Sequence, residues 1–280
     1  MTDALRNALG GFSVVALVTN IPGPLAAARM RQCGARVTKI EPLAGDPLEI
    51  AAPQWYATLV HGIRVLRLDM REPSSQAILA DALDTADVLL TATRASVLER
   101  LHLGWERLHA SYPRLVHVAL CGEAPPNDSR AGHDLTYQAR AGTIAPPAMP
   151  RALVGDMAAA ERAISAVLQA LLLRERTGES VRVDVSIVDA AAAFAEPYRQ
   201  GLTAESGSLG GALPSYGVYA ARRGYVAVAA LEPHFSERLQ RLLGVGDLSR
   251  ESIAAALLER DAQEWEQRAL ADDVPLAAVR

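Results

Sequence analysis

The sequence predicts an α/β fold in two domains, and three observations lead to that prediction. Short β-branched runs alternate with helical stretches over residues 1–190. Residues 191–214 include the Gly/Ser-rich stretch ESGSLGGALPS, and residues 215–280 begin with two strand-like runs and continue as helices. We therefore expect a large domain with a mainly parallel sheet, a linker or active-site loop, and a smaller α+β domain.

The first βαβ unit opens the large domain. The run SVVALV (13–18) is short and β-branched, LAAARMRQCG is helical and ends at Gly34, and RVTKI (36–40) reads as the next strand. Two parallel neighbours need such a crossover helix between them.

The alternation then continues along the chain. We expect a strand RVLRLDM (64–70), a helix SSQAILADALDTA, a strand VLL (88–90), a helix near 97–101 and a strand RLVHVAL (114–120). This order predicts a Rossmann-like domain over residues 1–190. No Gly-rich phosphate-binding fingerprint follows the first strand, so the topology does not imply a dinucleotide cofactor.

The smaller domain is expected over residues 215–280. SYGVYAARRGYVAVAAL (215–231) reads as two strands about a turn at Arg222-Arg223-Gly224. Three helical segments follow, which are PHFSERLQRLLG, SIAAALLER and AQEWEQRAL.

Composition limits the classes of function. The 280 residues are 50% hydrophobic, enough for a sizeable core, and 28 basic against 32 acidic residues leave a net charge of −4, so we expect no nucleic-acid partner. The chain shows neither a signal-peptide pattern nor a run of ~20 apolar residues, so we expect no membrane association. Two cysteines, Cys33 and Cys121, favour neither disulfides nor a zinc site and suggest a reducing cytoplasm.

The candidate chemistry lies between residues 130 and 178. Gly132-His133-Asp134 comes first, a Pro-rich connector follows, and Asp156 stands at the head of a long helix that ends at Gly178. If the fold brings His133 and Asp156 together, they form an acid/base pair. Each also has a plainer interpretation, since Asp is a common helix N-cap and a lone His is commonly a turn or core residue.

Several segments together resemble one protein family. GARVTKIEP (34–42), TRASVLERLHLG with PRLVHVALCG, RAGHDLTYQARAG, LVGDMAAA and RERTGESVRVDVSIVDA occur in the order in which family III CoA-transferases carry similar segments. The likeness covers nearly the whole chain and is closest to the alpha-methylacyl-CoA racemase branch. Two details favour that branch: His133 stands where many transferases carry an aromatic, and ALEPHF (230–235) resembles a racemase segment with a functional Glu.

The resemblance implies a set of catalytic residues. His133 and Asp156 would be the two acid/bases, and Glu232 would be hydrogen-bonded near the histidine. It also implies an acyl-CoA substrate, with coenzyme A as part of that substrate, and neither a prosthetic group nor a metal. The expected assembly is an interlocked homodimer, in which the large domain of one subunit meets the small domain of the other.

The resemblance also implies residues that bind the CoA phosphates. Lys39 and Arg94 are the candidates, and Arg64 is a weaker one. Because Thr38 and Ile40 flank Lys39 on the other sheet face, we expect the Lys39 side chain to lie outside the core.

The chemistry of a thioester fits a pair of acid/bases. A thioester acidifies the hydrogen on its α-carbon, and inverting that centre requires a base on one face and an acid on the other. Imidazole suits this role near neutrality, whereas Asp156 needs a raised pKa. The N–H groups of the helix after Asp156 would then stabilise the charge that develops on the thioester oxygen.

Two other functions remain open from the sequence. In a CoA-transferase, Asp156 would be a nucleophile that forms an acyl anhydride and then a thioester with CoA. In a non-catalytic relative, the site would bind CoA or only scaffold a partner. Ala158, Ala159 and Ala160 stand where racemases look Gly-rich, and Glu161 follows, so we expect methyl groups and a negative charge to hinder the substrate there.

Overall fold

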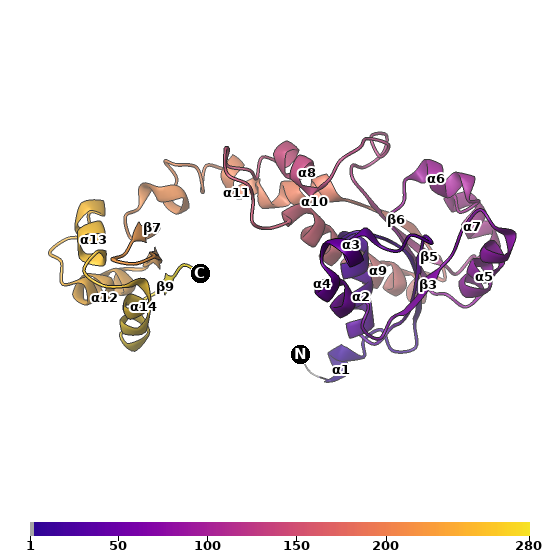
Figure 1. Ribbon diagram of the computed structural model, residues 1–280, viewed down its shortest axis with the longest axis horizontal. Helices are drawn as coiled ribbons and strands as arrows, with labels where there is room; N and C mark the ends of the chain where they lie inside the picture. Colours follow the sequence, from indigo (N-terminus) through magenta and orange to yellow (C-terminus); the bar gives the residue numbers. More distant parts are fainter. Residues whose placement is uncertain (1–2) are drawn as a thin grey trace. The chain divides into compact units, whose positions relative to one another are not determined.

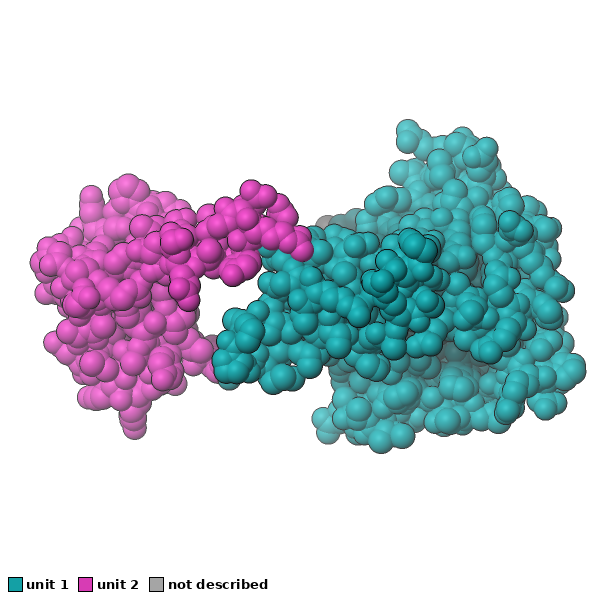
Figure 2. Space-filling view, turned by 90° about the horizontal axis from the view of Figure 1, so that it is seen from above, with its two compact units in different colours: residues 1–195 teal, residues 196–280 magenta. Residues whose placement is uncertain are grey.

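The computed structural model describes residues 3–280 (Figure 1). The chain divides into two compact units, residues 1–195 and 196–280, which Figure 2 shows in different colours. The stretch expected as a linker, 191–214, is structured for the most part. It contains the end of α10 (Ile187–Phe194), helix α11 (Glu196–Arg199) and a short π-type turn, η1 (Ser208–Ala212).

The first unit is built on a six-stranded sheet. All neighbouring strands are parallel, and their order is β3-β2-β1-β4-β5-β6. The strands are β1 (Ser13–Leu17), β2 (Arg36–Glu41), β3 (Arg64–Arg67), β4 (Val88–Thr91), β5 (Val116–Cys121) and β6 (Arg182–Ser186). This is the doubly wound order of a Rossmann fold, so the predicted fold class is confirmed.

Helices cover both faces of this sheet, as a buried parallel sheet requires. Besides α10, the helices of this unit are, in chain order, α1 (Asp3–Arg6), α2 (Pro22–Gln32), α3 (Pro47–Ala51), α4 (Pro53–Leu59), α5 (Pro73–Asp84), α6 (Ala95–Arg100), α7 (Trp105–Ser111), α8 (Asp134–Ala141) and α9 (Val154–Thr177). Residues of α2 and α9 share one core cluster with one sheet face, and residues of α5, α6 and α7 share another with the opposite face.

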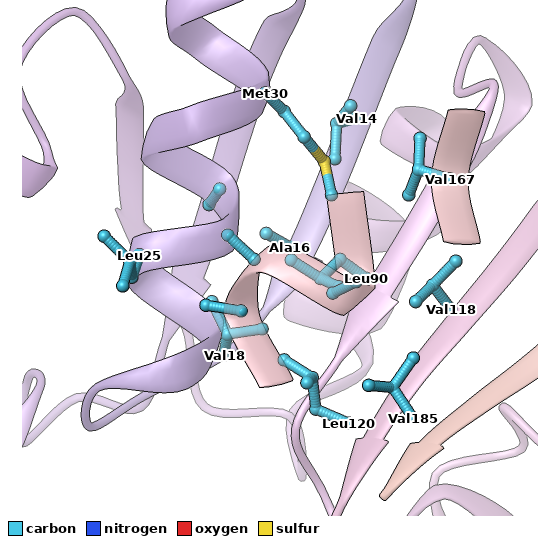
Figure 3. Packing of buried hydrophobic residues seen from close by; sticks show 14 of the residues in the cluster. Val14, Ala16, Val18, Leu25, Met30, Leu90, Val118, Leu120, Val167 and Val185 are labelled. Atoms are coloured by element: carbon cyan, nitrogen blue, oxygen red, sulfur yellow. The ribbon is translucent and has the colours of Figure 1, made fainter. Parts of the chain in front are cut away.

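Alternation along β1 shows how the sequence fills the two cores. Val14 and Ala16 point into the cluster with α2 and α9, where Met30 and Val167 meet them (Figure 3). Val15 and Leu17 belong to the opposite cluster. Because both faces are buried, the strand is apolar throughout instead of alternating, which is typical of a central parallel strand.

The second unit has a three-stranded antiparallel sheet and, after α11, three further α-helices. The strands are β7 (Tyr216–Ala220), β8 (Tyr225–Ala229) and β9 (Leu276–Ala278), and the helices are α12 (Pro233–Leu243), α13 (Arg250–Leu257) and α14 (Ala262–Ala271). Trp265 is buried in their core, and its indole N–H donates to the Leu257 carbonyl at 2.9 Å. The two predicted strands and their turn are confirmed, whereas β9 was not predicted.

Among residues 3–280, none of the helices combines the length and the apolar composition that crossing a bilayer requires.

Candidate active site

A cavity of about 270 Å³, here called the polar cavity, lies at the carboxyl edge of the six-stranded sheet. Its walls come from the turn after β1, the turn after β4, the loop between β5 and α8, the first turn of α9, and β6. The strand order reverses between β1 and β4, and ligands of doubly wound folds bind outside the strand ends at such a switch point. Three of the predicted residues, His133, Asp156 and Arg94, line this cavity.

His133 is placed by the start of α8. Its N–H donates to Thr136 Oγ1 at 3.1 Å, and the Thr136 hydroxyl donates to the His133 carbonyl at 2.8 Å. These two bonds fix the backbone at the helix entrance, a reciprocal arrangement common at N-termini. The imidazole itself is exposed and lines the polar cavity, where a substrate can reach it.

Asp156 occupies the third position of α9. Burial, and secondly the Asp134 carboxylate, raise the pKa of its carboxyl to about 7. Both the protonated and the ionised forms are therefore populated near neutral pH, which an acid/base catalyst requires.

Asp134 supports Asp156 from the neighbouring helix. It is buried, and its Oδ1 accepts the backbone N–H of Asp156 at 2.9 Å. Gln138 Nε2 donates to Asp134 Oδ2 at 2.5 Å and to the Ala152 carbonyl at 2.8 Å. Asp134 thus satisfies an otherwise orphaned donor of α9.

The N-cap interpretation of Asp156 is wrong. Helix α9 begins at Val154, with Leu153 in the N-cap position, so Asp156 lies inside the first turn. The capping acceptor comes from Asp134, which is 22 residues away in the chain. Local sequence holds no signal for an acceptor supplied by another helix.

The expectation that the first N–H groups of this helix face the thioester oxygen is also wrong where it can be checked. The N–H of Asp156 donates to Asp134, and the N–H of Met157 donates to the Leu153 carbonyl at 2.9 Å. These two N–H groups are therefore engaged within the protein, and other groups of the cavity are candidate donors for the oxygen.

Tyr137 is one such group, and sequence analysis missed it. Its ring is buried on the cavity wall against Gly122 and Gly132, where an added Cβ would lie 2.3 Å from tyrosine atoms. Burial, and secondly the charge of Asp156, raise the pKa of the Tyr137 hydroxyl, so it remains a donor at neutral pH. The two glycines are needed because any side chain there would displace this ring.

Charged side chains surround the rest of the polar cavity. Arg94 is exposed and immediately precedes α6. Arg130 contacts Glu123 at 3.2 Å, and Arg182 donates to Asp184 Oδ1 through Nε at 3.1 Å and Nη2 at 2.8 Å. Arg130, Arg182 and Asp184 were not predicted, the last two because β6 was not predicted as a strand.

Lys39 lies away from the cavity, and the expectation that its side chain is outside the core is wrong. It is fully buried beneath the sheet edge, and its ammonium bonds the carboxylates of Glu41 and Asp46. Alternation did place Lys39 opposite Thr38 and Ile40, but that face is covered by α4, which contributes Tyr56. The assignment of Lys39 to a CoA phosphate gains no support from this position.

Two further predicted residues lie elsewhere. Arg64 is exposed on β3 and lines neither this cavity nor the one described below. Glu232 belongs to the second unit, where it is exposed at the N-cap position of α12. Its proximity to His133 stays a prediction.

The stretch after Asp156 does not hinder the cavity. Ala159 and Ala160 are fully buried in the core, and Ala158 packs against the same cluster. Glu161 forms an ion pair with Arg29 at 2.9 Å. None of these four residues lines the polar cavity, so the expected obstruction by methyl groups and charge is wrong.

A second, apolar cavity of about 580 Å³ adjoins the first. Thr19 and Thr93 line both cavities. The apolar cavity is lined mainly by apolar side chains from the carboxyl ends of β1, β2 and β3 and from α6. Glu41 also lines it, as do Arg71 and Asp69, which pair at 2.6 Å. A long ligand with one apolar and one polar end could therefore occupy both cavities along the sheet edge.

Comparison with known proteins decides the family. The family model for CoA-transferase family III matches residues 9–280. The chain belongs to this family. The alpha-methylacyl-CoA racemase of Homo sapiens is 32% identical to it over 262 residues, which cover 85% of this chain and 65% of the human protein. The succinyl-CoA–D-citramalate CoA-transferase of Chloroflexus aurantiacus is 30% identical over 205 residues, 67% of this chain and 51% of that protein.

Solved structures agree with the fold of this family III protein. The crystal structure of the hypothetical protein Rv3272 from Mycobacterium tuberculosis superposes with a TM-score of 0.83 at 25% identity, covering 97% of this chain and 85% of the other. A CAIB/BAIF family protein from Brucella suis gives a TM-score of 0.82 at 21% identity, which supports the fold alone. The chain spans between about half and two thirds of the length of the human and Chloroflexus proteins.

Proposed function

We propose that this family III protein inverts the α-carbon of an acyl-CoA thioester, such as a 2-methylacyl-CoA, through an enolate. His133 and Asp156 are the two acid/bases. The observation that supports this proposal best is that both side chains line one cavity, in which the Asp156 carboxyl has a pKa of about 7.

The reaction removes one proton from the α-carbon and returns one proton to it. The residue that faces the α-hydrogen of the bound enantiomer, in its unprotonated form, removes that hydrogen as a proton, and the electron pair of the C–H bond is delocalised onto the thioester oxygen. The other residue, protonated, then delivers its proton to the opposite face of the planar enolate. The opposite enantiomer uses the same two residues with their roles exchanged.

The surroundings of Asp156 fit this exchange of roles. A carboxyl of ordinary pKa would be almost wholly ionised at pH 7 and would be a poor acid. Burial and the neighbouring Asp134 bring the two forms close to balance. The charge on the enolate oxygen needs a donor, and the Tyr137 hydroxyl is the candidate on the cavity wall.

The two adjoining cavities suit the two ends of an acyl-CoA. We assign the adenine end to the apolar cavity, whose volume of about 580 Å³ and aliphatic lining suit an aromatic base. The thioester then reaches the polar cavity past Thr19 and Thr93. Arg94, exposed at the start of α6, is placed to meet the phosphates on this path.

A CoA-transferase with Asp156 as covalent nucleophile is the second candidate. It is supported by relatives such as the Chloroflexus CoA-transferase. A carboxylate nucleophile must be ionised, and with a pKa of about 7 only part of Asp156 is ionised at neutral pH. The raised pKa suits the exchange of roles in a racemase better, but it is compatible with either reaction.

We further propose that the protein acts as a homodimer and that Glu232, from the small unit, completes the histidine side of the site. Exchange of units between subunits is the arrangement implied by the family resemblance. Light scattering should give the mass of a dimer, and dilution should lower the activity. A stable monomer with full activity would contradict this proposal.

Deuterated water separates the two chemistries. The protein is incubated in D₂O with a single enantiomer of 2-methylacyl-CoA, with and without a free carboxylic acid such as succinate. The proposal predicts deuterium at the α-carbon and accumulation of both enantiomers without any acid. Formation of a new acyl-CoA only when the acid is present, with the α-hydrogen retained, would instead establish a transferase. If neither reaction occurs and calorimetry detects no CoA binding, the protein is a non-catalytic member of the family.

A further inference from the structure

Four buried polar side chains form a cluster under the carboxyl edge of the sheet. Lys39, Glu41, Asp46 and Tyr56, here called the Lys39 cluster, each expose 7% of their surface or less. They come from β2, the segment after it and α4. None of them takes part in the proposed proton transfers, although Glu41 also lines the apolar cavity.

The cluster is well satisfied by hydrogen bonds. The Lys39 ammonium donates to Glu41 Oε1 and, at 2.6 Å, to Asp46 Oδ2. The Tyr56 hydroxyl donates to Glu41 Oε1 at 2.6 Å, and Arg67 approaches Glu41 Oε2 at 3.4 Å. Burial, and secondly the bond to Glu41, raise the pKa of Tyr56, so its hydroxyl stays a donor.

Stability alone is a weak reason for such a cluster. Removing two charges from water costs several kcal/mol each, and well-packed apolar residues of similar volume often serve stability as well or better. The cluster therefore calls for an account of what it holds in place.

Asp46 connects the cluster to the two cavities. Its Oδ1 accepts the backbone N–H of Asn20 at 2.9 Å and that of Leu48 at 3.0 Å. The first bond reaches across to the turn between β1 and α2, and the second caps α3. One carboxylate oxygen thus joins two loops at the sheet edge, while the other is held by Lys39.

The turn that Asp46 holds is a common wall of both cavities. Thr19 lines both, and Asn20 and Pro22 line the polar cavity. Asn20 has φ +68°, a left-handed conformation that is uncommon for non-glycine residues, although asparagine adopts it more readily than most. Helix α2 begins directly afterwards without a side-chain cap. The bond from Asn20 to Asp46 is therefore a main restraint on the position of this wall.

We infer that Asp46 is a positioning residue for the substrate, which it serves by holding the turn Thr19–Pro22 in place, and that Lys39 serves by fixing Asp46. The consequence for the reaction rests on the proposal that one acyl-CoA occupies both cavities. The positioning itself is a property of the protein without any ligand.

A matched control lies at the amino-terminal ends of the strands of the same sheet. There Asp87 accepts the Ser13 backbone N–H at 2.9 Å and pairs with the buried Arg174 at 2.9 Å. Like Asp46, it combines a backbone acceptor with a buried cation. Its backbone partner Ser13 lines neither cavity, whereas Asn20, the partner of Asp46, lines the polar cavity. Asp87→Ala should lower stability as Asp46→Ala does, without moving the cavity wall.

Hydrogen exchange tests the positioning without a ligand. In Asp46→Ala, amides of residues 19–25 should exchange at least ~10-fold faster than in the parent once each variant is corrected for its global stability, and in Asp87→Ala they should not. Asp46→Asn keeps an acceptor oxygen and should retain most of the protection. If the alanine variant fails to fold, Asp46→Ser replaces it, because serine still caps α3 while its hydroxyl is one bond shorter than the carboxylate that bonds Asn20. Equal protection of residues 19–25 in Asp46→Ala and Asp87→Ala would overturn the inference.

Kinetics tests the consequence. Misplacing a substrate-binding wall costs on the order of 100-fold, so kcat/KM for α-proton exchange should fall by about that factor in Asp46→Ala and stay within about threefold of the parent in Asp87→Ala. An equal fall in both variants would show a general effect of lost stability and contradict the positioning role. If the parent neither exchanges the α-proton nor binds CoA, the proposed function fails, and the exchange of amides 19–25 still decides whether Asp46 holds the turn.

Discussion

Asp156 and His117 both have a pKa far from the usual range, but they lie in different surroundings. Asp156 lines the polar cavity at the carboxyl edge of the sheet, and its pKa is raised to about 7. His117 is fully buried near the start of β5. It is bonded to Thr91 at 3.0 Å, lies close to Trp105 and lines neither cavity. Burial, and secondly the charge of Arg182, lower its pKa to about 3.

The difference separates a reacting group from a packed one. Both shifts have burial as their largest cause, so the shift alone marks neither residue as functional. Access decides: a substrate can reach Asp156 but not His117. Substitution of Asp156 should therefore change activity, whereas substitution of His117 should change only stability. Variants of these two residues test the two parts of this contrast.

The largest effect is expected at Asp156. Asp156→Asn removes a proton-transferring group and should lower the rate of racemisation by 10²–10⁴-fold, the usual contribution of general acid–base catalysis. The backbone bond from residue 156 to Asp134 is kept, so circular dichroism should show an unchanged fold. Chiral separation of the acyl-CoA measures the rate, and racemisation at the parent rate would remove Asp156 from the mechanism.

The same variant should be more stable than the parent at alkaline pH. The folded pKa of Asp156 is raised above its unfolded value, so the parent loses stability as pH rises from about 4 through about 7, where the unfolded chain releases this proton first. Asparagine does not ionise, so the Asp156→Asn variant does not lose stability in this way as the pH rises. Urea unfolding at pH 8 should show Asp156→Asn to be more stable by at least ~1 kcal/mol, and a less stable variant would contradict the raised pKa.

His117 should govern stability in acid and leave activity unchanged. Its folded pKa is depressed, so its contribution is present above the unfolded value of 6.5 and is lost as pH falls toward the folded value of about 3. Between pH 6.5 and pH 5 the parent should lose roughly 2 kcal/mol more than His117→Gln. Urea unfolding at both pH values measures this difference, and an equal loss in the two proteins would show that His117 takes up its proton without unfolding.

Asp134 should set the pH at which Asp156 acts. Asp134→Asn removes a neighbouring negative charge, which is the second cause of the raised pKa, while burial, the first cause, remains. In the pH–rate profile, the apparent pKa assigned to Asp156 should fall by about one unit but stay above that of a free carboxyl. An unchanged profile would mean that the Asp134 charge does not act on Asp156.

The smallest effect is expected one turn further along α9. Glu161→Gln breaks an exposed ion pair with Arg29, and such pairs are worth ~0–1 kcal/mol. Racemisation should stay within twofold of the parent, which makes this variant a matched control for Asp156→Asn on the same helix. A clear gain of activity would revive the expectation that the negative charge of Glu161 hinders the substrate, and a large loss would show that Glu161 supports the site.

Much of the fold could be predicted because its strands are locally distinct. The central strands β1, β4 and β5 are continuous apolar runs with flanking helices, so periodicity finds them. Strand β6 was not predicted because Arg182 and Asp184 interrupt its apolar pattern. Strand β9 was not predicted because it has only three residues. Local pattern fails where a neighbour in space, and not in sequence, explains a residue.

The site residues, too, divide into those that local sequence predicts and those that only the fold explains. Spacing and resemblance singled out His133, Asp156 and Arg94, which the fold does bring to one cavity. Sequence misjudged Lys39 because its partners and the helix that covers it become apparent only in three dimensions. It misjudged the start of α9 because the acceptor, Asp134, belongs to another helix. Tyr137 was missed for a similar reason, since only the fold brings Gly122 and Gly132 against its ring.

Hydrogen exchange at the α-carbon of each enantiomer, catalysed by the two single variants, tests the central claim most directly. Each pure enantiomer of a 2-methylacyl-CoA is incubated in D₂O with His133→Ala and with Asp156→Asn, and α-deuterium is followed by NMR. If the two residues act on opposite faces, each variant retains one base, so His133→Ala should exchange one enantiomer and Asp156→Asn the other, both without inversion. Exchange of the same enantiomer by both variants, or inversion by either at the parent rate, would contradict the account.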